Sequence, residues 1–214
     1  LPGKSAIGHV RYSTTGSSVL TNAQPYKVDY SRGQVALAHN GNLVNAQMLR
    51  AKLEAYGSIF GSTMDSEIFI HLMANPAYRS HEEGVLEATK RVAGAYSLTI
   101  LTEKQLIGVR DPQGFRPLCL GKLGESYVLA SETCAFDLIE AEFVREIEPG
   151  EVVVIDEKGL RSQFPHKGME GMEHPVAQCI FEHVYFARPD STIFRDNVGF
   201  VRERLGRQLA REYP

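Results

Sequence analysis

The chain has 214 residues, of which 43% are hydrophobic and 23% are charged, and its formal net charge is −3 at pH 7. This composition is typical of a soluble globular protein with one large core, or with one domain and an appendage. The small net charge gives no indication of a general nucleic-acid or membrane-surface binder, and no apolar run approaches the ~20 residues that span a bilayer. We therefore expect neither nucleic-acid nor membrane partners.

The three cysteines, Cys119, Cys134 and Cys179, are odd in number and widely spaced. None of them forms a Cys-x-x-Cys pair, so neither a disulfide framework nor a self-contained zinc site is indicated. A reducing, cytoplasmic setting is the default expectation. The chain begins at Leu1 rather than at a methionine and ends at Pro214, directly after a helix-like segment. We interpret it as a piece of a longer protein, cut at both ends.

The first part of the chain is expected to alternate strands and loops. Residues 5–12 predict a strand that delivers Arg11 to its end, and a run rich in Ser, Thr, Gly, Asn and Pro follows as a loop. A second strand is expected at 35–40, and it ends in a sharp turn at Asn40-Gly41. A helix over 45–56 follows that turn.

Helix boundaries in the next part are marked by capping residues. Asn45 is the N-cap candidate of the first helix and Gly57 is its stop signal. A second helix opens at the Asp65 loop, and Ser80 with Glu83 forms a capping box at the start of a third.

From residue 95 onward the pattern changes to short strands. Hairpins are expected for 96–102 with 105–110 and, around Pro149-Gly150, for 144–147 with 152–155. The remaining predicted elements are strands at 118–120, 127–130 and 160–164 and a short helix between 131 and 141.

The last helix is expected over 197–213, with a buried apolar stripe and with its arginines mostly on the solvated side. That stripe comprises Val198, Val201, Leu205 and Leu209. We place one domain at 1–164, a patternless linker at 165–175, and a further segment at 176–214. Helices lying in sequence between early strands and a long antiparallel series predict an α+β fold with sheet and helix layers.

The Asn40-Gly41 dipeptide has two interpretations. At the exit of a strand, it can direct a side-chain amide and a bare backbone N–H to one point, as an oxyanion hole requires. Asn-Gly is also a common tight-turn dipeptide, because both residues tolerate positive φ. Taken alone, the plain turn is the favoured interpretation.

Arg11 and Asp65 carry similar pairs of interpretations. Arg11 at a strand exit can hold a carboxylate in a bidentate fork, although a surface arginine is more common. Asp65 at a loop-to-helix junction can hold an ammonium group or serve as an N-cap. Together with Asn40 and Gly41, they describe a site for a free amino acid undergoing acyl chemistry, and glutamine is the natural candidate.

No motif for a metal or a phosphate group is present. His9 and His39 do not have a ligand spacing with Asp65, so each is expected to be a buried or supporting histidine. GxxxxGKS and GxGxxG loops are both absent, and Ser131 lacks the context of a nucleophile elbow.

Three separated segments resemble the class II glutamine amidotransferase domain: Gly8-His9-x-Arg11-Tyr12-x-Thr14, His39-Asn40-Gly41-Asn42-Leu43 and Asp65-Ser66-Glu67. Later segments resemble the amidophosphoribosyltransferases within that family: 110–118, 131–137 and, above all, 181–191. The resemblance covers essentially the whole chain. It implies the N-terminal-nucleophile αββα fold, here incomplete at its N-terminus.

The resemblance also implies a mechanism. An N-terminal cysteine thiolate attacks glutamine with its own α-amine as base, Asn40 and Gly41 hold the oxyanion, and Arg11 and Asp65 hold the glutamine α-carboxylate and α-ammonium. Ammonia then displaces pyrophosphate from phosphoribosyl pyrophosphate in a second, magnesium-dependent domain, of which 176–214 would be the start. Such enzymes are expected to be homo-oligomers.

Two features depart from the family pattern: the missing N-terminal cysteine, and an end of the chain where the phosphoribosyltransferase domain should begin, with no pyrophosphate-binding acidic motif. The chain has no N-terminal cysteine, and no internal cysteine carries the free α-amine that the chemistry needs, so this chain alone is expected to be inactive. Cys179 matches a ligand of the [4Fe–4S] cluster found in some members, although a buried structural cysteine is an equal alternative. The competing interpretations are a degenerate, non-catalytic binding module and another class II amidotransferase.

Overall fold

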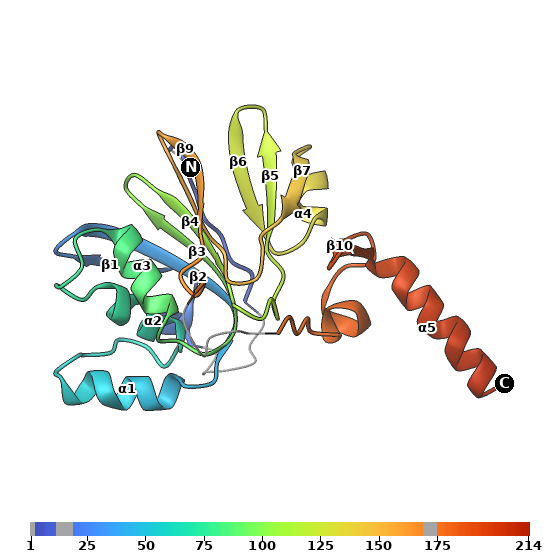
Figure 1. The fold of residues 1–214 in the computed structure, drawn as a ribbon, viewed down its shortest axis with the longest axis horizontal. Helices are drawn as coiled ribbons and strands as arrows, with labels where there is room; N and C mark the ends of the chain where they lie inside the picture. Colours follow the sequence, from blue (N-terminus) through green and yellow to red (C-terminus); the bar gives the residue numbers. More distant parts are fainter. Residues whose placement is uncertain (1–2, 12–18, 169–174) are drawn as a thin grey trace.

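The computed structural model describes residues 3–11, 19–168 and 175–214. Within them, two antiparallel sheets lie between helices (Figure 1). The larger sheet has the order β1-β2-β3-β4-β8-β9, and the smaller has the order β6-β5-β7. The strands of the larger sheet are β1 (Tyr26–Tyr30), β2 (Gly33–Leu43), β3 (Gly94–Thr102), β4 (Leu106–Arg110), β8 (Val152–Asp156) and β9 (Gly159–Gln163). Those of the smaller sheet are β5 (Cys119–Leu123), β6 (Ser126–Ala130) and β7 (Glu142–Glu146).

Three helices cover one face of the larger sheet: α1 (Ala46–Ala55), α2 (Ser66–Met73) and α3 (His81–Thr89). The main core forms between this face and the helices, where Leu37 of β2 and Ile100 of β3 join Phe69 and Met73 of α2 in full burial. Nearly every side chain of α2 is buried. This helix is therefore the central element of the helical layer, with α1 and α3 on either side of it in the chain.

A second core joins the two sheets. Leu118 and Leu120 pack there with Ile147 and with Val153 of β8. On the opposite side of β5, the short helix α4 (Cys134–Asp137) brings Phe136 against the strand. The layers thus follow the order helix, sheet, sheet, helix, as expected for an α+β fold.

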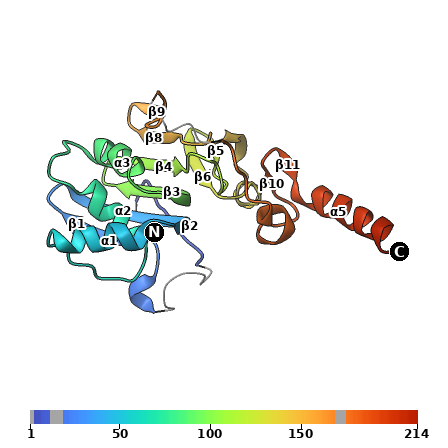
Figure 2. The same cartoon turned by 60° about the horizontal axis from the view of Figure 1, so that its bottom comes forward.

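The C-terminal part begins against this body and ends in a helix that projects from it. It comprises a π-helical turn η2 (Glu182–Phe186), a small ladder of β10 (Thr192–Ile193) with β11 (Asp196–Asn197), and α5 (Val198–Glu212). Both views show α5 projecting from the sheets toward the C-terminus (Figures 1 and 2). The remaining element is a 3-10 turn, η1 (Leu20–Asn22). No helix in the described ranges is long and apolar enough to span a bilayer.

The predicted helices are confirmed, and so is one of the two predicted hairpins, that of β3 with β4. Ser80 accepts a hydrogen bond from the N–H of Glu83, while the Glu83 carboxylate accepts from the N–H of Arg79. Gly57 has a φ of 89°, in keeping with a helix stop. Asn45 begins α1, but its side chain bonds the backbone of Arg91 and Ala93 instead of capping the helix.

Three predicted elements are wrong. Residues 5–11 form no strand, because no neighbouring strand in the described chain pairs with them. The segments 144–147 and 152–155 do not form a hairpin, because β7 pairs with β5 in one sheet and β8 with β4 in the other. In α5, Leu205 is 47% and Leu209 60% exposed, so the expected stripe is buried only at its start.

The proposed linker lies partly outside the described residues. Residues 165–168 form turns, whereas 169–174 are among those the structure does not describe. Residues 177–195 lie against the body: the N–H of Ala177 donates to the carbonyl of Gln113, and the N–H of Arg195 donates to the carboxylate of Glu146. The domain boundaries themselves stay a prediction.

Gly84 provides a test of the packing between α2 and α3. A Cβ at Gly84 would lie 2.3 Å from the carbonyl oxygen of Met73, so Gly84→Ala must push the helices apart. We expect it to lower the free energy of unfolding by about 1–3 kcal/mol, as overpacking does. In α5, a Cβ at Gly206 meets nothing within 4 Å, so Gly206→Ala should be neutral or stabilise by up to about 1 kcal/mol. Denaturant unfolding of both variants measures this, and equal effects would contradict the close packing.

Candidate active site

Asn40 and Gly41 lie inside strand β2 and not at a turn after it. The strand continues to Leu43, and its ladder pairs Asn40 with Ser97 and Gly41 with Tyr96. The strand-exit prediction and the plain-turn alternative are therefore both wrong. Two features require glycine at this position: its φ is 143°, and a Cβ would lie 2.0 Å from the carbonyl oxygen of Ala95.

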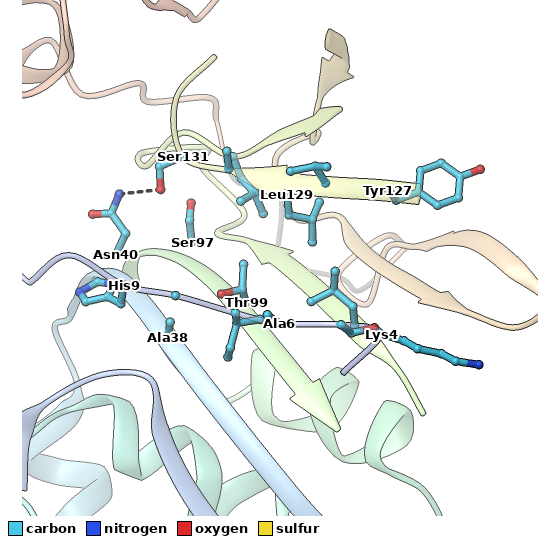
Figure 3. Close-up of a pocket in the computed structure, with 17 residues that line it drawn as sticks. Lys4, Ala6, His9, Ala38, Asn40, Ser97, Thr99, Tyr127, Leu129 and Ser131 are labelled. Carbon is cyan, nitrogen blue, oxygen red and sulfur yellow. Dashed lines mark hydrogen bonds between the residues drawn. The ribbon is translucent and has the colours of Figure 1, made fainter. Parts of the chain in front are cut away.

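The amide of Asn40 is held at both ends. Its Oδ1 accepts hydrogen bonds from Nη2 of Arg116 at 2.8 Å and from Nε at 3.2 Å, and its Nδ2 donates to Oγ of Ser131 at 3.3 Å. Figure 3 shows the amide nitrogen facing Ser131 above the strand. Because a guanidinium has only donors, Oδ1 must face Arg116, and the donor end must face away from it.

A cavity of about 340 Å³ opens beside this amide. It runs between the segment 4–9, strands β2 and β3 of the larger sheet, and strand β6 of the smaller (Figure 3). Its polar side chains near Asn40 are those of His9, Ser97, Thr99 and Ser131. Ser97 is buried, and its hydroxyl has no hydrogen-bond partner among the described residues. The amide of Asn40 thus lies at the polar part of a cavity between the two sheets.

Asp65 lies next to the end of the same strand. Its Oδ2 accepts a 2.8 Å hydrogen bond from the N–H of Leu43, and its Oδ1 is 3.4 Å from Nδ1 of His39. Its side chain does not cap α2. Burial acts to raise the pKa of Asp65, but the contacts with His39 and the backbone N–H groups outweigh it and lower the pKa. The carboxylate is therefore ionised at neutral pH and available to an ammonium group.

Two histidines connect Arg11 to this region. His39 is buried, with Nδ1 3.2 Å from Oγ of Ser66, while His9 lines the cavity. Burial lowers the pKa of His9, and the charges of His39 and Arg11 lower it further. Arg11 is therefore near this histidine pair. Tyr12 and Thr14, which complete the first family segment, lie outside the described residues.

A metal centre does not form from the described residues. In the ranges 3–11, 19–168 and 175–214, no group of three or more His, Cys, Asp or Glu side chains could hold a metal ion. Cys179 is half-buried and has a free thiol. One thiolate does not by itself fit a [4Fe–4S] cluster, which takes four ligands. Cluster ligation by Cys179 stays a prediction.

The sequence alone did not place Arg116, Ser131 or Glu182 in the candidate site. Arg116 bonds Asn40, and its Nη1 is 2.8 Å from Oε1 of Glu182, while Ser131 accepts from Asn40. All three lie in segments that carried the family resemblance. That signal marked the segments, but it could not show which side chains meet across 76 and 91 residues of chain.

Residues 9–137 match a family model described as the glutamine amidotransferase domain. The chain belongs to this family. Over its whole length it is 50% identical to a chloroplastic amidophosphoribosyltransferase of Glycine max, covering 37% of that protein. It is 43% identical to the amidophosphoribosyltransferase of Bacillus subtilis, with 98% of the chain and 43% of the relative aligned. The chain thus spans less than half the length of these glutamine amidotransferases.

Two solved structures share this fold. One is a glutamine phosphoribosylpyrophosphate amidotransferase from B. subtilis complexed with ADP and GMP, with a TM-score of 0.86, 40% identity, and coverage of 95% of this chain and 43% of that one. The other is described as the allosteric regulatory enzyme of purine biosynthesis, with a TM-score of 0.88, 41% identity and the same coverages. The N-terminal-nucleophile α+β fold expected from the glutamine amidotransferase resemblance is confirmed.

The His9 ring reports the electrostatics of this site. Because its pKa is lowered, protonating it costs folding free energy, so its contribution to stability is present above pH 6.5 and is lost as the pH falls through the folded pKa. We expect an NMR titration midpoint below 6.5, and His39→Gln should raise it by removing a nearby charge. His81→Gln, in α3, is the control and should leave it unchanged. A midpoint at or above 6.5 would contradict the arrangement.

Proposed function

We propose that this chain is the glutaminase part of an amidophosphoribosyltransferase. The observation that carries the proposal is the Asn40 amide, fixed by Arg116 beside the close-packed Gly41, in a chain 43–50% identical to proteins of that name. In the proposed reaction, ammonia released from glutamine reacts with phosphoribosyl pyrophosphate to give 5-phosphoribosylamine in purine biosynthesis.

Attack on the glutamine side-chain amide produces a tetrahedral intermediate with a negatively charged oxygen. We propose that Nδ2 of Asn40 and the N–H of Gly41 donate to this oxygen, which develops charge only as the reaction proceeds. Arg11 would hold the α-carboxylate by a two-pronged hydrogen bond, and Asp65 the α-ammonium. The lowered pKa of Asp65 suits this role, because the carboxylate then stays charged at neutral pH.

The nucleophile in this proposal is a cysteine at the amino terminus of the mature protein, whose own α-amine takes the thiol proton. The internal cysteines do not suit the role. Cys119 is fully buried, and burial raises its pKa to about 12, which keeps the thiol protonated. Burial also raises the pKa of Cys134. Cys179 is inside the chain and has no free α-amine.

The rest of the proposed enzyme follows from the relatives. A second domain would bind phosphoribosyl pyrophosphate with magnesium, Cys179 would contribute to a [4Fe–4S] cluster if one is present, and the protein would be a homo-oligomer. Cysteine usage favours the cytoplasm, whereas the plant relatives are named chloroplastic. Another class II amidotransferase, or a non-catalytic glutamine-binding module, would share the Asn40 site and lack the second activity.

Full-length natural protein tests these alternatives directly. We expect 5-phosphoribosylamine formation from phosphoribosyl pyrophosphate with either glutamine or ammonia as the nitrogen donor. Glutamine hydrolysis without use of phosphoribosyl pyrophosphate would indicate another amidotransferase. Glutamine binding measured by calorimetry, without turnover, would indicate the non-catalytic module.

Asn40→Ala tests the oxyanion hole. Removing one donor of this kind lowers kcat by about 10²–10³, so we expect a loss of that size with glutamine as donor. Ammonia-dependent synthesis should be unchanged, because it does not pass through the glutamine intermediate. Steady-state kinetics with both donors measure this, and an equal loss with ammonia would contradict the role.

Arg11→Ala tests the carboxylate site. A hydrogen bond to a charged group contributes about 1.5–3 kcal/mol, so the glutamine KM should rise about 10- to 100-fold. The ammonia-dependent rate should persist. Arg204, a largely exposed arginine on α5, provides the matched control, and Arg204→Ala should change neither value. An unchanged glutamine KM in Arg11→Ala would refute the assignment.

A further inference from the structure

Arg116 occupies a junction between the candidate site and the C-terminal segment. On one side it bonds Oδ1 of Asn40 twice, and on the other its Nη1 lies 2.8 Å from Oε1 of Glu182 in η2. Its guanidinium also lies 4.9 Å from the ring centre of Phe186. One side chain therefore contacts both the amide of the proposed oxyanion hole and a segment about 140 residues later in the chain.

We propose that Arg116, held in place by Glu182, is a positioning residue that fixes the amide of Asn40 with its donor end toward the reacting carbonyl. The inference rests on the proposed glutaminase function and adds that this function depends on the C-terminal segment. The seating of residues 179–187 sets the orientation of Arg116, and Arg116 sets the orientation of the oxyanion-hole donor.

The chemistry of the amide carries the first step. An asparagine side chain can rotate by 180° and exchange its oxygen and nitrogen at little cost when its neighbours accept both arrangements. Here the reverse orientation would place the NH₂ group against the donors of Arg116 and lose both hydrogen bonds. Ser131 cannot impose the same choice, because a hydroxyl both donates and accepts. Arg116 alone among the described partners of Asn40 selects the orientation.

The backbone of Arg116 is anchored independently of its side chain. Its N–H donates to Oδ2 of Asp111 at 3.1 Å, and its carbonyl accepts from Nε of Arg110 at 2.9 Å. Asp111 and Arg110 are both buried. The turn 111–116 thus presents the side chain from a fixed base, and the position of the guanidinium depends on its partners.

Glu182 is the partner that holds the outer side of the guanidinium. Its side chain is 4% exposed and that of Arg116 19%, and the 2.8 Å contact is a charge contact without the alignment of a hydrogen bond. Burial raises the pKa of Glu182, while the charge of Arg116 opposes that rise. The N–H of Glu182 donates to the carbonyl of Cys179, and its carbonyl accepts from Ala187. The backbone that carries Glu182 is therefore held within the turn 179–187, and the carboxylate reaches Arg116 from there.

A kinetic comparison in the full-length natural protein tests the proposal. We expect Arg116→Gln to lower kcat for glutamine about 10-fold or more, with the glutamine KM within about threefold, because an oxyanion donor acts in the transition state. Ammonia-dependent synthesis should be unchanged. Arg116→Lys should lose less kcat than Arg116→Gln does. Its ammonium group can contact Asn40 or Glu182, but it cannot reproduce the two parallel donors of the guanidinium.

A double-mutant cycle separates positioning from a general structural role. If Arg116 acts through Asn40, Arg116→Gln should cause no further loss of kcat in the Asn40→Ala background. If the kcat losses of Arg116→Gln and Asn40→Ala instead multiply in the double variant, the proposal is overturned. Glu182→Gln should lower kcat less than Arg116→Gln does, because it removes the charge beside the guanidinium but leaves both hydrogen bonds from Arg116 to Asn40 in place. If kcat is unchanged in Glu182→Gln, the part of the proposal in which residues 179–187 orient Arg116 is wrong.

Arg145 supplies the matched control. It forms two hydrogen bonds with the buried carboxylate of Glu151, and neither residue lines the cavity, so Arg145→Gln removes a comparable ion pair outside the site. It should lower thermal stability without changing kcat for glutamine. If wild-type protein does not hydrolyse glutamine, the proposed function fails. If it does and Arg116→Gln matches wild type, only the present inference fails.

Discussion

The pairing of β2 with β3 is the interaction on which the rest of the site depends. Nine residue pairs, from Val35 with Thr102 to Leu43 with Gly94, hold the two strands together. The ladder fixes Asn40 opposite Ser97 and allows the backbones at Gly41 and Ala95 to approach more closely than any Cβ permits. The N–H of Leu43, at its end, is also the donor that anchors Asp65. One ladder therefore supplies or fixes three of the four proposed glutamine contacts.

Buried charge connects this ladder to the rest of the molecule. Asp111 accepts hydrogen bonds from the N–H groups of Gln113, Phe115 and Arg116, and its own N–H donates to the carbonyl of Tyr96 on β3. A buried carboxylate is costly unless its oxygens are bonded, so these contacts specify the turn 111–116 closely. Because the buried carboxylate of Asp111 needs these hydrogen bonds, it also fixes the backbone position of Arg116, the arginine that bonds Asn40.

Local patterns predicted the elements that local forces determine. Helix capping at Ser80, the stop at Gly57 and the hairpin of β3 with β4 depend on residues within a few positions, and each was correct. Strand partners were less predictable, because pairing is a long-range contact. The segment 144–147 overlaps β7, which pairs with β5, and segment 5–11 pairs with no strand in the described chain. The apolar side chains of α5 kept their helical period, but the described residues do not cover most of them.

The sequence by itself determined the family, the α+β class and the residues of the candidate site, because motif identity and hydrophobic period are properties of the chain. It also indicated glutamine, through an arginine, an aspartate and an Asn-Gly pair whose functional groups complement that amino acid. Tertiary structure decided how these residues are held. It showed Gly41 inside a strand where only glycine fits, and it brought Arg116 and Glu182 to the amide of Asn40. Asn40 and Arg116 are 76 positions apart in the chain, and a local sequence pattern does not predict a contact between residues so far apart.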